Sequence, residues 1–234
     1  MNILSEIIYL YKRKIALGFS IPKDALVIDI GSGDKPFWRA DVFVDKLSLG
    51  NLQRASHSKT IHNLGIFVDA DVMHLPFKDK AFDFSFSSHL LEHVEDPDKA
   101  LKEIMRISKA GYFEVPNGIL ETIRPFHSHL WFIYQKEKGI VFFRKSKHMH
   151  EVLKQNGKKY DQLMGKINDP FIRMHWKKKV AYQIIDLYKN SERFYPKNET
   201  KKSEKKNFNF YLLLVKIIRA FSYQEKTINN SIYK

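Results

Sequence analysis

Two glycines and two acids near the start of the chain have the types and spacing of a cofactor-binding turn. Gly31 and Gly33 directly follow Val27-Ile28-Asp29-Ile30, a short β-branched run that is typical of a strand buried on both faces. Only glycine lets the backbone approach a ligand closely at such a turn. Asp45 comes sixteen residues after Asp29, where the acid that ends a second strand accepts hydrogen bonds from ribose hydroxyls. These residues predict a site for a nucleotide-like cofactor.

Later segments strengthen this prediction. Asp71 precedes Leu75-Pro76-Phe77, and a strand-like run over 82–88 leads into His89-Leu90-Leu91-Glu92-His93-Val94. With these motifs, residues 24–117 resemble the class I S-adenosylmethionine-dependent methyltransferases, and within them the methyltransferase type 11-like domains. The resemblance implies an α/β, Rossmann-like methyltransferase fold with a mostly parallel seven-stranded sheet that ends in an antiparallel hairpin.

The resemblance also assigns the cofactor contacts. It implies that Asp29, Gly31 and Gly33 hold the methionine end of S-adenosylmethionine, and that Asp45 holds the ribose. Acids suit this ligand because its transferable methyl group sits on a sulfonium cation. The alternative is that the aspartates only cap helices or turns.

For the other end of the cofactor, the resemblance implies that Asp71 contacts the adenine amino group and that Val72 is the apolar neighbour of the ring. Ser88 and His89 are expected at the end of the fourth strand, beneath the cofactor. All of these positions fall near the ends of predicted strands, where open parallel sheets bind ligands.

The sequence departs from the family pattern after the glycines. Asp34-Lys35-Pro36-Phe37-Trp38 follows, and only eleven residues separate Gly33 from Asp45. That is too few for a crossover helix and a strand, so the first helix is predicted to be absent. Phe37 and Trp38 are expected to pack in the core, with contact to the cofactor as the alternative.

Histidines are the candidates for the chemical step. If the acceptor is a hydroxyl, a base must take its proton as the oxygen attacks the methyl group, and histidine has a suitable pKa. His127 and His129, between the fifth strand and the hairpin, are the first candidates, and His89 is the alternative. Packing roles remain open for all three. Glu114 and Asn117, near the end of the fifth strand, are candidate substrate contacts.

His89 and His93 flank Glu92 at a spacing that would place both histidines on one helical face. That geometry could hold a metal. The resemblance, however, implies a structural connection at this segment, and no metal is expected.

The remaining chain is organised around predicted strands and helices. Strands are expected over 66–70 and 82–88, a helix from Asp96-Pro97, and a fifth strand over 111–115. Residues 131–135 and 140–144 flank a turn and predict a hairpin that supplies the sixth and seventh strands. An amphipathic helix is expected within residues 1–18.

Charge divides the 234 residues unevenly. Residues 1–139 contain 18 basic and 18 acidic side chains, whereas residues 140–234 contain 22 basic and 8 acidic ones and so carry the whole net charge of +14. We therefore expect a methyltransferase domain over 1–150 and a basic, largely helical extension over 151–234, partly disordered. Such a tail could bind nucleic acid or an anionic membrane, or be only a solvated extension.

An apolar segment over 208–221 predicts a helix near the end of the chain. It is expected to dock on its own domain or on a second subunit, with an anionic membrane surface as the alternative. The chain has no cysteine, which excludes disulfides and thiolate metal sites. A cytoplasmic location is expected, with peripheral membrane attachment as the alternative.

Together these features predict an S-adenosylmethionine-dependent methyltransferase that acts by direct displacement. The expected acceptor is a small molecule, or a glycan or lipid-linked sugar, and the expected atom is oxygen. An RNA acceptor that uses the basic tail is the second hypothesis. A non-catalytic cofactor-binding protein that tethers a partner is the third.

Overall fold

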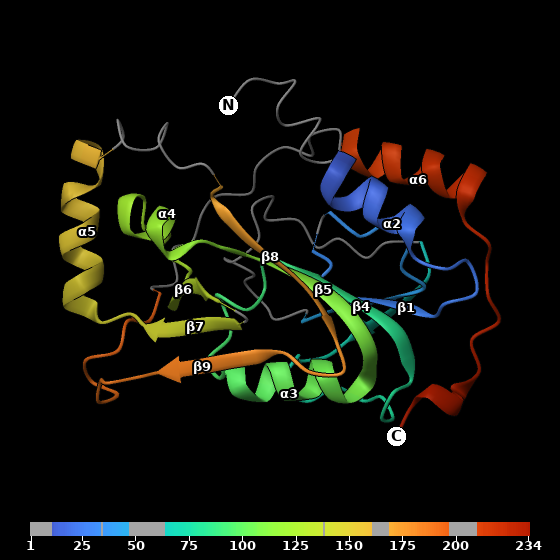
Figure 1. Ribbon diagram of the computed structural model, residues 1–234, viewed down its shortest axis with the longest axis horizontal. Helices are drawn as coiled ribbons and strands as arrows, with labels where there is room; N and C mark the ends of the chain where they lie inside the picture. Colours follow the sequence, from blue (N-terminus) through green and yellow to red (C-terminus); the bar gives the residue numbers. More distant parts are fainter. Residues whose placement is uncertain (1–10, 34, 47–63, 138, 161–168, 197–209) are drawn as a thin grey trace.

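The computed structural model describes residues 11–33, 35–46, 64–137, 139–160, 169–196 and 210–234. Its centre is a six-stranded sheet in the order β3-β2-β1-β4-β5-β8 (Figure 1). These strands are β1 (Val27–Ile30), β2 (Val42–Asp45), β3 (Ile66–Asp69), β4 (Phe82–Ser88), β5 (Ser108–Pro116) and β8 (Phe171–Lys177). Strands β1 to β5 are parallel to their neighbours, and β8 is antiparallel to β5. The chain order reverses between β1 and β4, and in such sheets ligands bind at the carboxyl ends of these strands.

The predicted hairpin forms, but in a second sheet. Strands β6 (Trp131–Lys136) and β7 (Gly139–Arg144) pair antiparallel, and β9 (Ala181–Ile185) pairs with β7 in parallel. The expected seven-stranded sheet ending in this hairpin is therefore wrong. The edge of β5 is occupied by β8, from Ala110 opposite Lys177 to Pro116 opposite Phe171.

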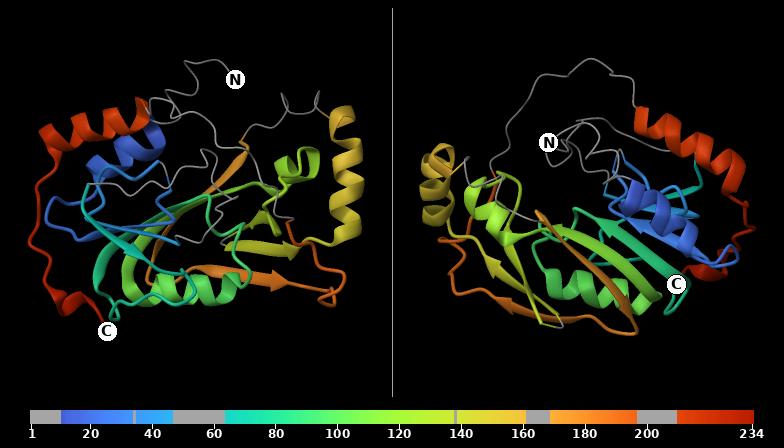
Figure 2. Two further views of the ribbon diagram at one scale, coloured as in Figure 1. Left: turned by 180° about the vertical axis from the view of Figure 1, so that it is seen from behind. Right: turned by 45° about the horizontal axis from the view of Figure 1, so that its top comes forward.

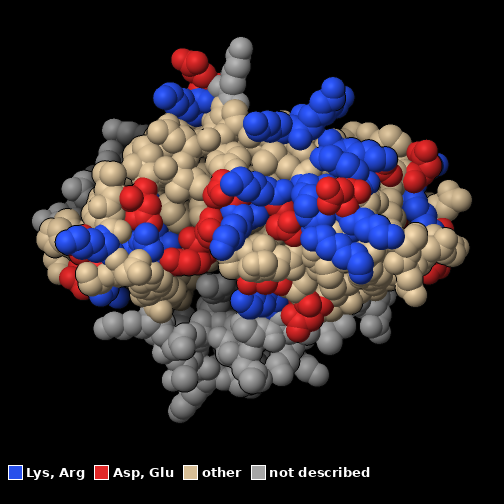
Figure 3. All heavy atoms as spheres, turned by 90° about the horizontal axis from the view of Figure 1, so that it is seen from below, with Lys and Arg blue, Asp and Glu red and all other residues tan. Residues whose placement is uncertain are grey.

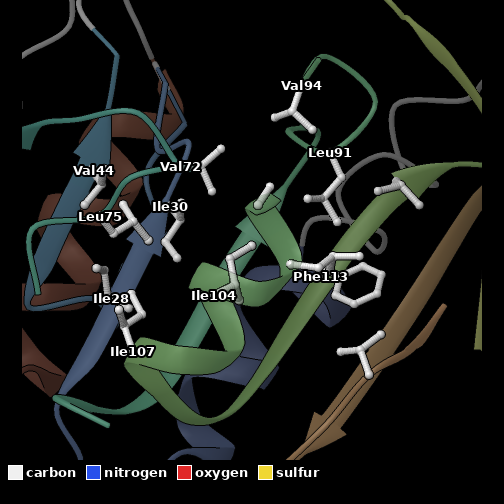
Figure 4. Close-up of a cluster of buried hydrophobic side chains, with 14 of the residues drawn as sticks. Ile28, Ile30, Val44, Val72, Leu75, Leu91, Val94, Ile104, Ile107 and Phe113 are labelled. Carbon is white, nitrogen blue, oxygen red and sulfur yellow. The ribbon is translucent and has the colours of Figure 1, made fainter. Parts of the chain in front are cut away.

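One face of the main sheet is covered by α3 (Pro97–Ile107), which begins where the sequence predicted. The Asp96 side chain accepts a hydrogen bond from the N–H of Lys99 and so caps the helix. Ile104 and Ile107 of α3 are buried in the same apolar cluster as Ile28 and Ile30 of β1 (Figure 4). This cluster holds α3, which connects β4 to β5, on one face of the sheet.

The opposite face is covered by segments from both ends of the chain. A π-helical turn η1 (Tyr11–Ala16), the short helix α2 (Leu17–Ser20) and α6 (Phe210–Ser222) lie on this side, with α2 and α6 next to each other (Figures 1 and 2). They pack on Phe37 and Trp38, which are 0% and 2% exposed. Both aromatic residues are thus core residues, as expected. The described residues between β1 and β2 contain no helix, which agrees with the predicted loss of the first crossover helix.

Helix α6 is attached to the β1–β2 connection through one buried side chain. The Arg219 guanidinium donates hydrogen bonds to the carbonyl oxygens of Trp38 and Ala40, each over 2.7 Å, and to that of Leu64. The Tyr211 hydroxyl donates to the carbonyl of Pro36 over 2.7 Å. Helix α6 therefore docks on the domain that contains β1 and β2.

The described residues after 150 contain strands as well as the helices that the sequence predicted. The described part of this region holds the end of α5 (Lys147–Tyr160), strands β8 and β9, α6 and the 3-10 turn η3 (Asn230–Ile232). Ile172, Met174 and Trp176 of β8 alternate with polar residues and join the main apolar cluster. The expected boundary at residue 150 falls within α5. Residues 1–10 and the whole basic run over 197–206 lie outside the described residues.

Basic and acidic side chains are mixed on the face that carries α3 (Figure 3). Lys102 pairs with Asp98 on this helix over 2.6 Å, and Arg106 pairs with both Glu103 and Asp79. Among the described residues, no helix has the length and hydropathy needed to cross a membrane.

Candidate active site

The glycine turn after β1 is tied to the end of β2. The N–H groups of Gly31 and Ser32 both donate to the carbonyl of Val44, over 2.8 and 3.1 Å. Gly31 and Gly33 have φ angles of 76° and 50°, which glycine adopts without strain. The N–H of Gly33 donates to Oδ2 of Asp45 over 2.8 Å. The structure therefore brings the predicted glycines and the predicted ribose acid together at the carboxyl ends of β1 and β2.

Asp29 lies beneath this turn and is only 1% exposed. Its Oδ2 accepts a hydrogen bond from the N–H of Phe37 over 2.7 Å. Burial raises the pKa of Asp29 to about 7, against the lowering effects of the Lys14 charge and the Phe37 N–H. This carboxyl group can therefore change charge near neutral pH. Lys14 was missed by the sequence analysis, because only the fold brings the N-terminal helical segment to β1.

Asp71 lies after β3 and is partly buried. Its Oδ1 accepts from the N–H of Met73 over 2.9 Å, and its Oδ2 forms an ion pair of 2.9 Å with Lys46. Burial alone would raise the pKa of Asp71, but the bonds from Lys46 and Met73 outweigh it and lower that pKa. Val72 is 6% exposed and joins the core with Ile30 (Figure 4). An ionised acid and a buried apolar residue are therefore consecutive after β3, and the adenine assignment stays a prediction.

The chain changes direction sharply at the end of β4. Ser88 lies opposite Glu114 of β5, and the next residue, His89, has a φ of 57°, a strained value for a residue with a Cβ. Its N–H donates to the carbonyl of Glu114 over 2.9 Å. Residues 89–96 form turns rather than a helix, so the condition under which His89 and His93 would share a helical face is not met. The left-handed His89 backbone starts a turn where a helix would need a right-handed residue.

The His89 ring lies between two fully buried acids. Its Nδ1 is 3.2 Å from Oε1 of Glu92, and its Nε2 is 3.3 Å from Oε1 of Glu114. Glu114, a candidate substrate contact, also accepts a hydrogen bond from Nε of Arg173 over 3.1 Å. Both ring nitrogens of His89 therefore face carboxylates in this structure.

Glu92 is 0% exposed and remains charged. Burial would raise the pKa of Glu92, but the His89 hydrogen bond and the neighbouring histidines hold that pKa at about 2. His93 lies beside it, with Nε2 4.0 Å from Glu92 Oε1, and burial lowers the pKa of His93 to about 4. At neutral pH the pair therefore consists of a carboxylate and a neutral imidazole.

His129 is buried and held by an acid from α4 (Gly118–Ile123). Its Nδ1 lies 2.7 Å from Oε2 of Glu121, and Oε1 of Glu121 pairs with the buried Lys145. The His129 ring packs edge-on to His93 with centroids 4.7 Å apart. His129 thus belongs to the same polar cluster as Glu92 and His89, which begins at the end of β4.

Two other candidate residues, His127 and Asn117, have different surroundings. His127 is exposed, and Asn117 uses its side-chain oxygen to cap α4 by accepting from the N–H of Ile119. The sequence analysis missed Glu121 and Lys145. Glu121 is a charged residue in a mostly apolar stretch, but Lys145 lies in a basic stretch 24 positions away, and only the fold pairs them.

Comparison with known proteins gives a consistent result for residues 30–113, a range that includes Asp45, Asp71 and Glu92 but neither Asp29 nor His129. A family model described as a methyltransferase domain matches residues 30–113. An uncharacterised protein of Methanocaldococcus jannaschii is 34% identical over 114 residues, which is 47% of each chain. A demethylmenaquinone methyltransferase of Streptomyces griseus is 32% identical over 108 residues, which is 44% of this chain and 46% of the relative. The chain thus matches about half the length of these curated relatives.

Among solved structures, the PH0226 protein of Pyrococcus horikoshii is similar to this chain with 19% identity and a TM-score of 0.40. The match covers 64% of this chain and 81% of that protein.

Proposed function

Because residues 30–113 form a class I S-adenosylmethionine-dependent methyltransferase domain, we propose that this chain transfers the methyl group of S-adenosylmethionine to a small hydroxyl-bearing molecule. The observation that carries the proposal is the placement of Asp29, Asp45 and Asp71 at or just after the carboxyl ends of β1, β2 and β3. Three acids at one edge of a parallel sheet suit a cationic ligand that also carries ribose hydroxyls and an adenine amino group.

In the proposed complex, each acid has a separate task. Asp45, already positioned by the Gly33 N–H, accepts from the ribose, and Asp71 accepts from the adenine amino group. Asp29 supplies negative charge near the methionine end once it is ionised. S-adenosylmethionine supplies an activated methyl group on a sulfonium, so the chain needs to orient the acceptor and exclude water.

The proposed reaction is an in-line displacement. A bond forms between the acceptor oxygen and the methyl carbon while the carbon–sulfur bond breaks, and sulfur keeps the electron pair. The hydroxyl proton leaves the oxygen in the same step. His129 is the first candidate to receive it, because Glu121 engages its Nδ1 and leaves Nε2 for a proton. His89 is the weaker candidate, since both of its ring nitrogens face carboxylates.

The acceptor itself is proposed only as a class. A small molecule or a lipid-linked or glycan hydroxyl is the first candidate, because an acid-held histidine suits the removal of a hydroxyl proton. A ring carbon of a quinone-type acceptor is the second, since one relative is named a demethylmenaquinone methyltransferase. If that ring carries a hydroxyl next to the reacting carbon, His129 would take the proton of this hydroxyl.

The test combines cofactor binding with a search for the acceptor. Calorimetry with S-adenosylmethionine is expected to give equimolar binding. Incubation with methyl-labelled cofactor and fractionated cell extract is expected to place the label in a small-molecule or lipid fraction. The label should be absent when Asp45→Asn replaces the wild-type protein, and NMR of the product then distinguishes an O-methyl from a C-methyl group.

Two outcomes would contradict this proposal. Label in the RNA fraction alone would favour an RNA acceptor. Tight cofactor binding with no labelled product in any fraction would favour a non-catalytic protein.

A further inference from the structure

Three side chains of metal-binding types meet beside the end of β4. Glu92, His93 and His129 each present one ligand atom, and these atoms all lie within 4.8 Å of one another. Zinc binds nitrogen and oxygen ligands at about 2.0–2.2 Å, which puts neighbouring ligand atoms of a tetrahedral site roughly 3.3 Å apart. Small side-chain rotations would therefore close the three atoms around an ion.

Hydrogen bonds fix the histidine tautomers in the form that a metal needs. The carbonyl of Ser128 can only accept, so Nδ1 of His93, 3.0 Å away, must carry a proton. In the neutral ring this leaves a lone pair on Nε2. Glu121, which also pairs with Lys145, likewise accepts a hydrogen bond from Nδ1 of His129 and leaves Nε2 of that ring to bind a ligand.

These bonds are also the outer contacts of a metal site. A metal-bound histidine commonly donates its second N–H to a carboxylate or a backbone carbonyl, which orients the ring. His129 has the carboxylate of Glu121, and His93 has the carbonyl of Ser128. Two histidines from separate segments are thus oriented in the same way.

The charge at the cluster points to a cation. Glu92 is 0% exposed, and its Oε2 accepts no hydrogen bond from the described residues. Among the described residues, the basic side chains that lie within 4.0 Å of its carboxylate are the rings of His89 and His93, and Lys145 acts on it only through its charge. A buried carboxylate is stabilised when a positive charge is paired with it.

From this arrangement we propose that Glu92, His93 and His129 bind one divalent transition-metal ion, with zinc as the type case. Two imidazoles and one carboxylate form a ligand set that zinc and ferrous iron use in proteins with coordination positions left for solvent or substrate. The sequence analysis expected no metal at this segment, and this proposal departs from that expectation. His129 lies 36 positions from His93 in the chain, so the spacing of His89 and His93 alone did not indicate the third ligand.

The site deepens the proposed function, and this part of the inference rests on it. A hydroxyl that coordinates a divalent cation has a lowered pKa, so the ion would assist removal of the acceptor proton. Nε2 of His129 would then be a ligand and not the base. Metal binding itself is measurable without any methyl transfer.

The experiment uses the full chain after removal of metals with a chelator. Titration calorimetry with zinc chloride is expected to show equimolar binding, and cobalt(II) is expected to give a visible absorption band that zinc abolishes. His129→Ala should weaken zinc binding by more than ~100-fold, the upper end for loss of an outer contact. Glu121→Gln, which removes an outer contact of His129 and not a ligand, should weaken zinc binding by about 10–100-fold in protein that circular dichroism shows to be folded.

Controls distinguish zinc binding at this site from binding to surface histidines, and loss of binding from loss of the fold. His148→Ala removes an exposed histidine of α5 and should leave zinc affinity unchanged. Because His129→Ala could fail to fold, the isosteric Glu92→Gln is measured beside it, and circular dichroism checks both.

The proposal is overturned if the wild-type protein binds no equimolar zinc, or if both variants retain wild-type affinity. Zinc binding without methyl transfer would contradict the proposed function alone. Undiminished methyl transfer by the metal-free protein would overturn the ion's part in proton removal and leave the proposed function standing.

Discussion

The backbone N–H of Gly33 donates to the Oδ2 of Asp45 over 2.8 Å. This bond joins the glycine turn after β1 to the acid that ends β2, across a connection too short for a crossover helix. The turn is therefore positioned by the acid that is expected to hold the ribose. Loss of that acid should affect both cofactor binding and the turn.

Asp45→Asn is expected to weaken S-adenosylmethionine binding by about 10-fold to 100-fold, because a hydrogen bond to a charged group contributes roughly 1.5–3 kcal/mol. Calorimetry measures the change. Asp69→Asn is the matched control, since Asp69 is exposed and lies opposite Asp45 in the β2–β3 register. Equal losses in the two variants would remove Asp45 from the ribose site.

Cofactor affinity should rise with pH through about 7. Burial raises the pKa of Asp29 from 3.8 to about 7, so the carboxyl is neutral below this pH and charged above it. A cationic ligand favours the charged form, and binding near pH 7 should release a proton. Calorimetry in buffers of different ionisation enthalpy measures that release. Asp29→Asn should bind weakly and without this pH dependence, and a flat wild-type profile would refute the assignment.

The same group should affect the stability of the ligand-free protein in the opposite direction. Between about pH 4 and 7 the folded state holds a proton on Asp29 that the unfolded state has lost. Stability therefore falls as pH rises across this window. Urea denaturation gives the free energy of unfolding of wild type and of Asp29→Asn. As pH rises across this window, the wild-type value should fall relative to that of the variant.

His129→Ala is expected to reduce methyl transfer by about 10²-fold to 10⁴-fold, the range typical of lost acid–base assistance, whether His129 takes the acceptor proton itself or holds the proposed ion. Cofactor affinity should stay within about twofold, since His129 lies with Glu92 and Glu121 rather than with the three aspartates. Initial rates at saturating cofactor measure the effect, with His148→Ala as the control. A variant with wild-type turnover would exclude His129 from the reaction.

The buried pair of Glu121 and Lys145 should make an asymmetric contribution to stability. Burial lowers the pKa of Lys145, while the Glu121 charge opposes that shift. Glu121→Gln leaves the ammonium without a charged partner and is expected to cost about 3–5 kcal/mol. Combining it with Lys145→Met removes the unpaired charge and should recover most of the loss. Urea denaturation measures the stability of wild type, the single variant and the double variant. A double variant less stable than Glu121→Gln would contradict the prediction.

Arg219→Ala is expected to destabilise the protein by about 3 kcal/mol, because three carbonyl oxygens lose a charged donor. Cofactor binding should weaken as well, since the residues between β1 and β2 lose their attachment to α6. Lys216→Ala, an exposed change on the same helix, should stay within about 0.5 kcal/mol of wild type. Equal stability of the two variants in thermal unfolding would show that α6 docks without Arg219.

The sequence indicated the elements whose signals are local. Strands β1 to β5, the Asp96 cap of α3 and the hairpin of β6 and β7 each follow from periodicity or turn chemistry within a few residues. The glycine turn and its acid were found for the same reason, since a short connection limits where Asp45 can lie.

Features that depend on distant partners were missed. The hairpin signal could not tell which sheet the hairpin joins, because β8 competes for the edge of β5. Ile172, Met174 and Trp176 alternate with polar residues, but the basic composition of residues 140–234 favoured an extension over a strand. Glu121 and Lys145 are compatible with burial only as a pair, and no local pattern identifies such a pair.

The Arg219 contacts also bear on the order in which the chain can fold. The carbonyls that this side chain binds, between Trp38 and Leu64, precede it by 155 to 181 positions. Contacts of such high sequence separation slow folding, because a long loop must close before they form. A nascent chain leaving the ribosome would therefore complete the glycine turn and its surroundings only after α6 emerges. Refolding should accordingly show late recovery of cofactor binding, after the parallel strands have formed.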